Sequence, residues 1–437
     1  MTTAIIVSVL IFIATYIGIL SKKIDRTIAA ISGAVSMIIV GHIFGFYDQS
    51  VSYIAFRYID FNTLGLLLGM MIIVGLLGDT GFFEYLAVKT AKMSNGSYYR
   101  LLALFVLVTA FTSAFLDNVT TVLLMAPVTI SIAKELDINP VPFLMAEVIS
   151  SNIGGTATLI GDPPNIMIGS AANLHFSQFI IYLAPIVMIV LFVVLLIFEL
   201  IFKDILEEDM KNFEKVTAME ESEFIKDWGM FKKTLWVLLF TLILFSFHHV
   251  IGIEPWLVAI TGASLLLLLS LSDPEQALEH VHWTTLLFFI GLFIIVGGLY
   301  EAGVINLLAS EMEIASGGNI VLALFIVIMA SGIFAMIVGN IPAAITLIPA
   351  VGLFIENSGI GTGYPINPLW WALSLGACFG GNGTLISAPA NLIVSNFAEK
   401  KGYYISFKEF TKLGLPITLF SLLFSFFLLW IFFIVLM

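Results

Sequence analysis

Three carboxylates stand in strongly apolar stretches of the chain: Asp117, Glu147 and Asp162. An ionisable side chain at membrane depth is costly, so it is a functional candidate by default. No lysine or arginine falls within the predicted core segments to pair with these groups. Uncompensated carboxylates favour a cation or a proton over an anion. All three are therefore candidates for coupling cation transport to proton transport, and we expect Asp117 to be the coupling carboxylate.

Uncharged oxygens accompany the carboxylates in two stretches, residues 151–165 and 380–391. Such hard ligands suit Na⁺, whereas the single cysteine, Cys378, provides no cluster for a soft metal. The six histidines fall near predicted helix ends or in loops, where an interfacial placement is favoured over a metal site. We therefore expect an ion site with no cofactor, no metal beyond a possible Na⁺, and Na⁺ or H⁺ as the coupling ion. Its other expected members are Asn118, Thr120, Thr121, Asn152, Gly154, Gly155, Thr156, Thr158, Asn165, Asn340, Gly380, Gly381, Asn382, Thr384, Ser387 and Asn391.

Each candidate also has a purely structural interpretation. Asp162 precedes a proline, which is a strong helix start, so it could simply cap a helix. Register with Asn340 makes Asn118 the natural cap of its own helix, which would leave Asp117 free for function. Glu147 could face an interface or bond to a backbone group. The amides and hydroxyls could merely satisfy helix ends, and the positive partial charge of helix N-termini would favour an anion.

The stretch 151–165 reads Ser-Asn-Ile-Gly-Gly-Thr-Ala-Thr-Leu-Ile-Gly-Asp-Pro-Pro-Asn. Its prolines donate no backbone hydrogen bond, so a helix that reaches Gly161 should end there and a new one should begin at Pro163. Irregular backbone is tolerated in lipid where protein buries it or water reaches it. We expect a broken helix at a binding site, with Gly154 and Gly380 adopting unusual backbone angles.

The break occurs twice. Residues 380–391 repeat its Gly-Gly, Thr-Leu-Ile, Pro and Asn in register, 226 positions further along. Two upstream blocks recur 222 positions apart, 117–121 with 339–343 and 72–75 with 294–297. Three blocks in one order indicate an internal duplication of the kind found in transporters.

The composition indicates a polytopic membrane protein. Of 437 residues 60% are hydrophobic and 11% are charged, and the mean hydropathy is +1.07, whereas a soluble chain carries about a quarter charged residues. The formal charge of −12 comes mostly from loops, and nothing suggests a nucleic-acid partner. Spans of roughly 20 apolar residues are predicted near 3–20, 27–46, 61–78, 141–170 (broken), 178–202, 234–252, 256–272, 284–299, 368–394 (broken) and 412–436.

Two pairs of apolar legs flank polar tips at 98–136 and 319–355. We interpret each pair as a re-entrant hairpin that enters and leaves on one side, with a plain pair of spanning helices as the alternative. Each half then crosses five times, so the second half is inverted relative to the first and the hairpins enter from opposite faces. This arrangement and the register of the repeats predict that Asn118, Asn152, Asn340 and Asn382 converge near the midplane.

Lysines and arginines predict the orientation. They cluster at Lys22, Lys23 and Arg26, at Lys89, Lys92 and Arg100, in the stretch 203–233, and at Lys400, Lys401 and Lys408. Placing these groups inside puts both termini outside. The predicted organisation is a first repeat over 1–202, a charged cytoplasmic linker over 203–233 that we expect to be a solvated connector, and an inverted repeat over 234–437.

The tip at 117–121 (Asp-Asn-Val-Thr-Thr) and the motif at 152–165 resemble the ion transporter superfamily, in particular its ArsB/NhaD branch with the P-protein type permeases. The resemblance covers nearly the whole chain. It implies secondary active transport of a small ion across the plasma membrane by an elevator-like or rocking movement, usually in a homodimer. Similar proteins include Na⁺/H⁺ antiporters, arsenite and antimonite exporters and, more distantly, di- and tricarboxylate carriers.

Within this family the residues favour a cation/proton antiporter of the Na⁺/H⁺ type. The carboxylate carriers have Ser-Asn-Thr at both tips, whereas this chain has Asp-Asn-Val at 117–119 and Gly-Asn-Ile at 339–341. The alternatives are an exporter of arsenite, antimonite or another oxyanion, and a di- or tricarboxylate symporter. A passive channel fits broken helices in inverted repeats less well. No nucleophile–base pair or nucleotide loop supports an enzyme.

Overall fold

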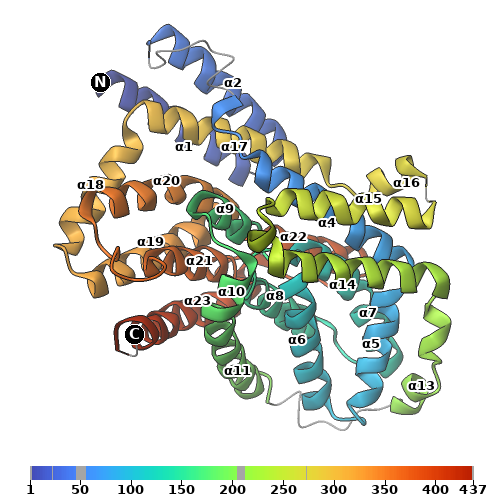
Figure 1. Cartoon of the computed structure of the whole chain (residues 1–437). Helices are drawn as coiled ribbons and strands as arrows, with labels where there is room; N and C mark the ends of the chain where they lie inside the picture. Colours follow the sequence, from blue (N-terminus) through green and yellow to red (C-terminus); the bar gives the residue numbers. More distant parts are fainter. Residues whose placement is uncertain (1, 22, 46–55, 204–211, 272, 436–437) are drawn as a thin grey trace.

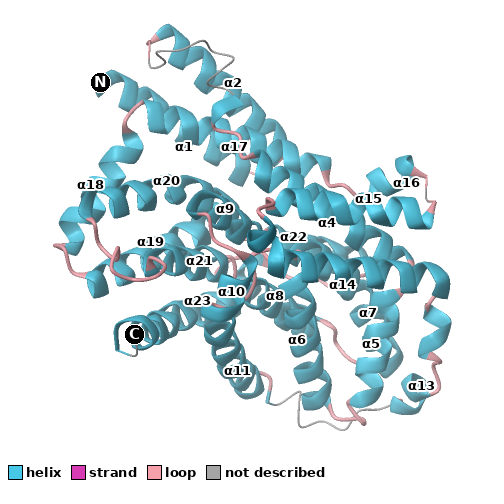
Figure 2. Ribbon diagram, viewed as in Figure 1, coloured by secondary structure: helices cyan, strands magenta, loops and turns pink. Residues whose placement is uncertain are grey.

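The computed structural model describes residues 2–21, 23–45, 56–203, 212–271 and 273–435. Within these ranges the chain is helical and has no strand (Figure 2). Eleven of the described helices are long and apolar enough to cross a membrane. Large hydrophobic side chains such as Met188, Phe192 and Leu200 are exposed on the outer helix faces, where lipid would cover them. The predicted all-α polytopic membrane fold is confirmed.

The first half contains ten described helices. They are α1 (Thr2–Leu20), α2 (Arg26–Ile43), α4 (Phe61–Asp79), α5 (Phe82–Met93), α6 (Tyr98–Phe115), α7 (Asn118–Leu136), α8 (Val141–Gly155), α9 (Pro163–Ala172), α10 (Phe176–Tyr182) and α11 (Ala184–Ile201). Helices α6 and α7 form the first hairpin, and α8 and α9 are the two parts of the first broken helix.

The second half repeats this order. It contains α14 (Trp228–Ile251), α15 (Pro255–Ser270), α16 (Pro274–Glu279), α17 (Trp283–Glu301), α18 (Val304–Ser316), α19 (Ile320–Val338), α20 (Asn340–Ser358), α21 (Pro368–Gly380), α22 (Pro389–Lys400) and α23 (Phe407–Leu429), which continues as a π-helix over Trp430–Val435. Here α19 and α20 form the second hairpin, and α21 and α22 form the second broken helix.

Equivalent helices of the two halves pack in exchanged pairs. Helix α4 packs on α15 as α17 packs on α2, and the hairpin helix α7 packs on α22 as α20 packs on α9. Within each half, α6 lies along α8 and α19 along α21. This exchange is what a two-fold relation between two repeats produces, and the five crossings per half predicted from the sequence would make the repeats inverted.

The helices form two groups. We call α1, α2, α4, α14, α15 and α17 the frame helices, and the hairpins and broken helices the core helices. The broken helices α8, α9, α21 and α22 lie at the centre of the molecule (Figure 1). Helices α5 and α18 connect each frame to its hairpin. The sequence did not predict them, because their apolar runs are too short for a membrane span.

The predicted spans agree with the helices, but their ends differ where a polar capping residue determines the start of the helix. Helix α14 begins six residues before the predicted 234 because the Asp227 carboxylate accepts hydrogen bonds from the amides of Gly229 and Met230 at 2.7 and 3.0 Å. The legs of the hairpins are 18 or 19 residues long, enough by length to cross a membrane. Their re-entrant course therefore stays a prediction.

The second half of the predicted linker packs on the first repeat through a few residues, while most of its side chains are exposed. Residues 213–227 contain α13 (Phe213–Thr217) and a 3₁₀ turn, and both pack on α5. Val216 and Ile225 are buried there, the Lys226 amide donates to the Thr80 carbonyl at 3.0 Å, and Lys92 pairs with Glu221. Residues 204–211 and Lys22, which entered the orientation argument, lie outside the described residues.

The expected role of the glycines also needs correction. Gly154 lies next to the last residue of α8 and Gly380 is the last residue of α21, and neither has a left-handed φ. What requires glycine is close approach, because an added Cβ would lie 2.2 Å from the Ala110 carbonyl oxygen at Gly154 and 2.5 Å from the Gly332 carbonyl oxygen at Gly380. Each glycine lets a hairpin helix touch the backbone of its broken helix.

Candidate functional site

Each hairpin tip is attached to the break of its own repeat by one backbone hydrogen bond. The Asn118 amide donates to the Gly161 carbonyl at 3.1 Å, and the Asn340 amide donates to the Ser387 carbonyl at 2.8 Å. The two bonds join equivalent positions of the repeats. They place the start of α7 and the start of α20 against the irregular backbone of the breaks.

Each break is closed by an asparagine of its second half-helix. The Asn165 side chain donates to the carbonyls of Thr156 and Thr158 at 3.0 and 2.8 Å. The equivalent Asn391 donates to the Thr384 carbonyl at 2.9 Å, and to that of Gly381 as well. Several carbonyls freed by the breaks are therefore already satisfied, so Asn165 and Asn391 stabilise the loops and these carbonyls are less available as ion ligands.

Side-chain amides link the two halves at the centre. Asn118 donates to Asn152 at 3.0 Å, Asn152 donates to Asn382 at 2.8 Å, and Asn340 donates to the Asp162 carboxylate at 3.2 Å. All five side chains are buried. We call them the central cluster; the sequence predicted the convergence of its four asparagines.

Asp162 occupies the N-cap position of α9, but its side chain makes no capping bond. The carboxylate is fully buried and reaches across to the second hairpin tip at Asn340 instead. Its charge also repels that of Asp117 nearby. The capping interpretation of Asp162 is therefore wrong for its side chain.

Asp117 has the opposite outcome. It is the N-cap of α7, since its Oδ1 accepts the Thr120 amide at 2.9 Å and its Oδ2 accepts the Thr120 hydroxyl. The prediction that Asn118 caps this helix and leaves Asp117 free was wrong, because α7 begins at Asn118, one residue earlier than a cap at Asn118 would require, just as α20 begins at Asn340. In the second repeat the cap position holds Gly339, with a φ of 107°.

Glu147 lies on α8 and faces α7, where its Oε1 accepts the Thr129 hydroxyl at 2.7 Å. It is buried, and its Oε2 has no hydrogen-bond partner among the described residues. No ion pair of the described residues involves Glu147, Asp117 or Asp162. None of the three carboxylates is therefore neutralised by a basic side chain of the described residues.

Two buried oxygens next to the carboxylates lack partners: Asn118 Oδ1 and Thr121 Oγ1. Both lie in the first turn of α7, and neither bonds to another described residue. A buried acceptor without a donor is costly unless a ligand satisfies it. Because both atoms are hard oxygen ligands, they fit a small cation such as Na⁺.

The remaining predicted hydroxyls have partners on the backbone. Thr156 donates to Asn152, Thr158 to Ala114, Thr384 to Met336 and Ser387 to Gly381. These bonds support the structural interpretation of the four hydroxyls. Gly155 and Gly381 sit inside the breaks in close contact with neighbouring chain, 2.6 Å and 3.0 Å from a carbonyl oxygen if a Cβ were added.

Sequence reasoning missed two polar groups of the second repeat. Ser374 and Cys378 on α21 both contact the Asn165 side-chain oxygen, Cys378 at 3.5 Å. Cys378 stands 226 positions after Asn152 and is its equivalent in the second repeat. Asn152 in turn contacts Asn391, the equivalent of Asn165, at 3.2 Å. The repeat register could have found this pair, but attention to charged residues passed over it.

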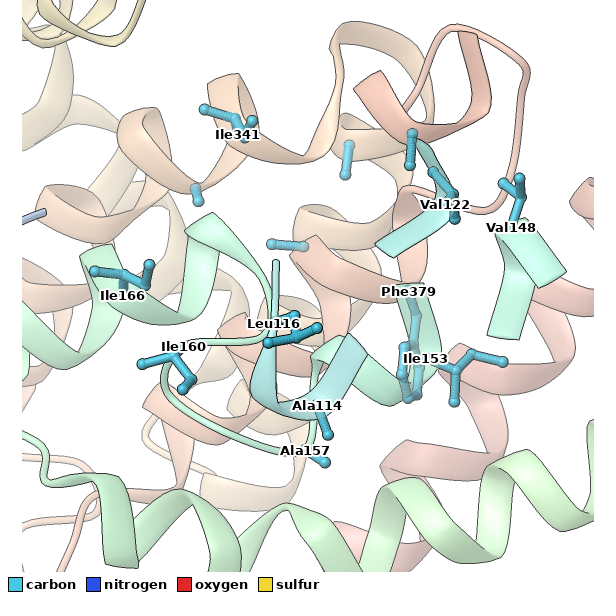
Figure 3. Close-up of a cluster of buried hydrophobic side chains, with 14 of the residues drawn as sticks. Ala114, Leu116, Val122, Val148, Ile153, Ala157, Ile160, Ile166, Ile341 and Phe379 are labelled. Atoms are coloured by element: carbon cyan, nitrogen blue, oxygen red, sulfur yellow. The ribbon is translucent and has the colours of Figure 1, made fainter. Parts of the chain in front are cut away.

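Apolar side chains surround the breaks. Figure 3 shows Leu116, Ile153, Ile160 and Phe379 gathered around them from both halves. In such an apolar environment the interactions between charges are stronger than in water. A cavity of about 80 Å³ lies against the second tip, where Asn340 and Ser387 line it together with Arg26 of the frame.

Comparison with known proteins adds the family. The family described as "Citrate transporter" (CitMHS) matches residues 16–376. An "uncharacterized transporter" of Mycobacterium tuberculosis (strain ATCC 25618 / H37Rv) is 42% identical over 436 residues, which is 99% of each chain. The human P protein is 31% identical over 497 residues, covering 96% of this chain and 59% of the P protein.

Solved structures share the fold. The YdaH transporter of Alcanivorax borkumensis has a TM-score of 0.59 at 15% identity, over 93% of this chain and 98% of that one. MtrF of Neisseria gonorrhoeae, described among antimetabolite efflux pumps, has a TM-score of 0.59 at 13% identity, over 98% and 94%. At these identities the likeness concerns the fold alone.

Proposed function

The chain belongs to the CitMHS citrate transporter family, and within that membrane transporter family we propose that it is a secondary active antiporter exchanging a cation of the Na⁺ type for protons. The observation that carries the proposal is the buried Asp162 carboxylate, which no basic side chain of the described residues neutralises. Burial disfavours an isolated charge, so this carboxylate is stable with either a proton or a cation bound. Competition of the two for one group is what antiport requires.

The surrounding donor set supports a cation. Asn118 Oδ1 and Thr121 Oγ1 are buried acceptors without partners, and the Asp117 carboxylate adds negative charge beside Asp162. A site with two carboxylates and orphan oxygens attracts Na⁺ or Li⁺ and repels a polyvalent anion. Glu147 makes a separate contact with Thr129 on α7 and is a secondary coupling candidate.

A carboxylate symporter is the second candidate, because the family is described as "Citrate transporter". The half-helix α22 begins with no side-chain cap, so its N-terminal amides offer positive partial charge to an anion. The adjoining cavity holds Arg26. The carboxylates of the first repeat argue against this candidate. They would repel an anion unless cations were bound with it. An arsenite or other oxyanion exporter has no comparable support.

We further propose how the exchange proceeds. The core helices move against the frame helices in an elevator-like or rocking motion and carry the central cluster from one face to the other, in a homodimer of the plasma membrane with both termini outside. The supports are the separation of frame and core in the packing, the positions of lysine and arginine and the family resemblance.

Flux through purified protein in proteoliposomes tests the proposal. Under an imposed pH gradient, uptake of Na⁺, Li⁺, arsenite and citrate is compared in parallel, with empty liposomes as the control. We expect Na⁺ or Li⁺ to accumulate against its own gradient when the inside is acidic. Citrate accumulation without cation–proton exchange would transfer support to the symporter, and uncoupled flow down the ion's gradient would indicate a channel.

A further inference from the structure

Three histidines meet away from the central cluster. His175 precedes α10, and His248 and His249 are in the last turn of α14. The rings of His175 and His249 are stacked, with centroids 4.7 Å apart and planes 18° apart, and His248 lies 5.5 Å from His175 and 6.0 Å from His249. Because α10 follows the core helix α9 and α14 is a frame helix, the group joins the two helix groups.

The histidines line a cavity of about 230 Å³. Its other polar wall residues are Asn62, Ser170, Asn173 and Glu254. They come from the starts of α4 and α15 and from the end of α9. One water takes about 30 Å³, so the cavity has room for several waters or for a small organic acid.

His248 has a buried nitrogen that nothing satisfies. The side chain is 4% exposed and its Nδ1 lies 2.9 Å from the Ile253 carbonyl oxygen. A carbonyl oxygen accepts hydrogen bonds, so Nδ1 carries a proton and Nε2 presents a lone pair when the ring is neutral. Nε2 has no partner among the described residues. A buried polar atom that lines a cavity without a partner points to a ligand.

We propose that this cavity binds a small carboxylic acid, held at His248 Nε2. A carboxylic acid donates its proton to the neutral nitrogen, and a carboxylate accepts a hydrogen bond from the protonated ring, so one ligand class satisfies both states. A metal is a poorer match, because stacked rings do not converge their nitrogens and no group of three or more His, Cys, Asp or Glu in the described part of the chain could hold one.

The charges around His248 make binding depend on pH. Glu254 is the acidic residue that lines the cavity, and it leaves the start of α15 without a side-chain cap. Asp60 on α4 is occupied by its own capping bonds and by Ser170. With neutral histidines the cavity is negative through Glu254, whereas two protonated rings make it positive. A carboxylate therefore binds together with protons.

Burial and the two neighbouring histidines lower the pKa of His175. A lowered pKa favours the neutral form of His175, so a carboxylate that binds beside it brings a proton with it. The sign follows: affinity for a carboxylate rises as pH falls through the histidine range and is lost as pH rises. The orientation predicted from the basic residues places this cavity on the outer side. The site is independent of the exchange proposed at Asp162.

Calorimetry on the intact chain in lipid nanodiscs tests the site with succinate as the probe and the uncharged succinamide as its isosteric control. Affinity for succinate at about pH 5.5 should exceed that at about pH 7.5 by about tenfold, because binding is linked to the uptake of one proton, which changes affinity by up to about tenfold per pH unit. Succinamide should show no such change. Equal succinate affinity at both pH values, or no binding at either, would overturn the proposal.

Two variants with opposite expected signs guard against misfolding. His248→Gln should abolish the pH dependence, whereas Glu254→Gln should strengthen succinate binding at about pH 7.5, since it removes the repelling charge without removing a cap. His42→Gln, at an exposed histidine outside the cavity, is the matched control. Wild-type pH dependence in His248→Gln, or weaker binding in Glu254→Gln, would contradict the assignment.

Flux measurements then identify the source of the acid. Uptake of labelled succinate that His248→Gln removes would show that the cavity receives a transported substrate. Succinate that changes cation exchange without being carried would show that it receives a regulatory acid. Both results support a carboxylic acid site. Succinate binding in calorimetry that His248→Gln leaves intact contradicts it.

Discussion

Gly154→Ala is the sharpest test of how the hairpin and the broken helix fit together. The added Cβ would lie 2.2 Å from the Ala110 carbonyl oxygen and 2.5 Å from the Ala110 Cα, whereas ordinary contact starts at 3.4 Å. Both neighbours are backbone atoms, so no side chain can rotate away. Helices α6 and α8 would have to separate by about 1 Å or more. We expect the cost to lie at or above the upper end of the usual overpacking range, about 1–3 kcal/mol.

The assay is thermal unfolding of the purified protein in detergent, followed by cation–proton exchange in proteoliposomes. Gly154→Ala should lower the free energy of unfolding by that amount and reduce exchange, while its insertion into the membrane stays normal. Gly363→Ala is the matched control, because nothing lies within 4 Å of an added Cβ there and its φ is not left-handed. A Gly154→Ala protein as stable and active as Gly363→Ala would refute the close-approach account of the break.

Three further predictions follow from the same geometry. Asp117→Ala should cost about 1 kcal/mol of stability by removing the cap of α7, whereas Asp117→Asn should keep that stability; thermal melts of both compare them, and equal losses would contradict the cap. Asn165→Ala should lower the free energy of unfolding by about 1–3 kcal/mol, since the buried carbonyls of Thr156 and Thr158 lose their donor. A melting temperature equal to that of wild type would refute the stabilising role of Asn165. Glu147→Gln should keep cation–proton exchange because this carboxylate bonds away from the central cluster, and loss of exchange would make it the coupling group.

Much of the architecture could be predicted from the sequence because its signals are strong and local. Apolar length and composition revealed the spans, and the duplicated blocks revealed that the breaks are equivalent. Register alone predicted that Asn118, Asn152, Asn340 and Asn382 converge. Three of the four are in direct contact, because Asn118 donates a hydrogen bond to Asn152 and Asn152 donates one to Asn382.

What could not be predicted depends on side-chain direction and on contacts distant in sequence. The positions of Asp117 and Asp162 both read as helix starts, yet one side chain turns back to its own helix and the other crosses to Asn340. The reason for Gly154 is the backbone of α6, which no local pattern reveals. The docking of the linker on α5 depends on Val216 and Ile225, two apolar residues within a charged stretch.

The histidines illustrate the same limit. Their positions near helix ends predicted an interfacial placement, and His175, His248 and His249 do lie at helix ends. Their convergence on one cavity arises from the packing of α10 against α14, which brings His175 beside two histidines that follow it by more than seventy positions. Sequence spacing carries no sign of that contact.

The central claim is that one buried carboxylate holds a proton and a cation in turn. The most direct measurement is pH-gradient-driven Na⁺ uptake by Asp162→Asn in proteoliposomes, beside wild type and Glu356→Gln, an exposed carboxylate outside the central cluster. The neutral amide keeps the size of the side chain and still bonds to Asn340 through its oxygen, so the protein should fold. We predict that Asp162→Asn loses proton-driven Na⁺ uptake while Glu356→Gln retains it. Uptake by Asp162→Asn with the pH dependence of wild type would contradict the account.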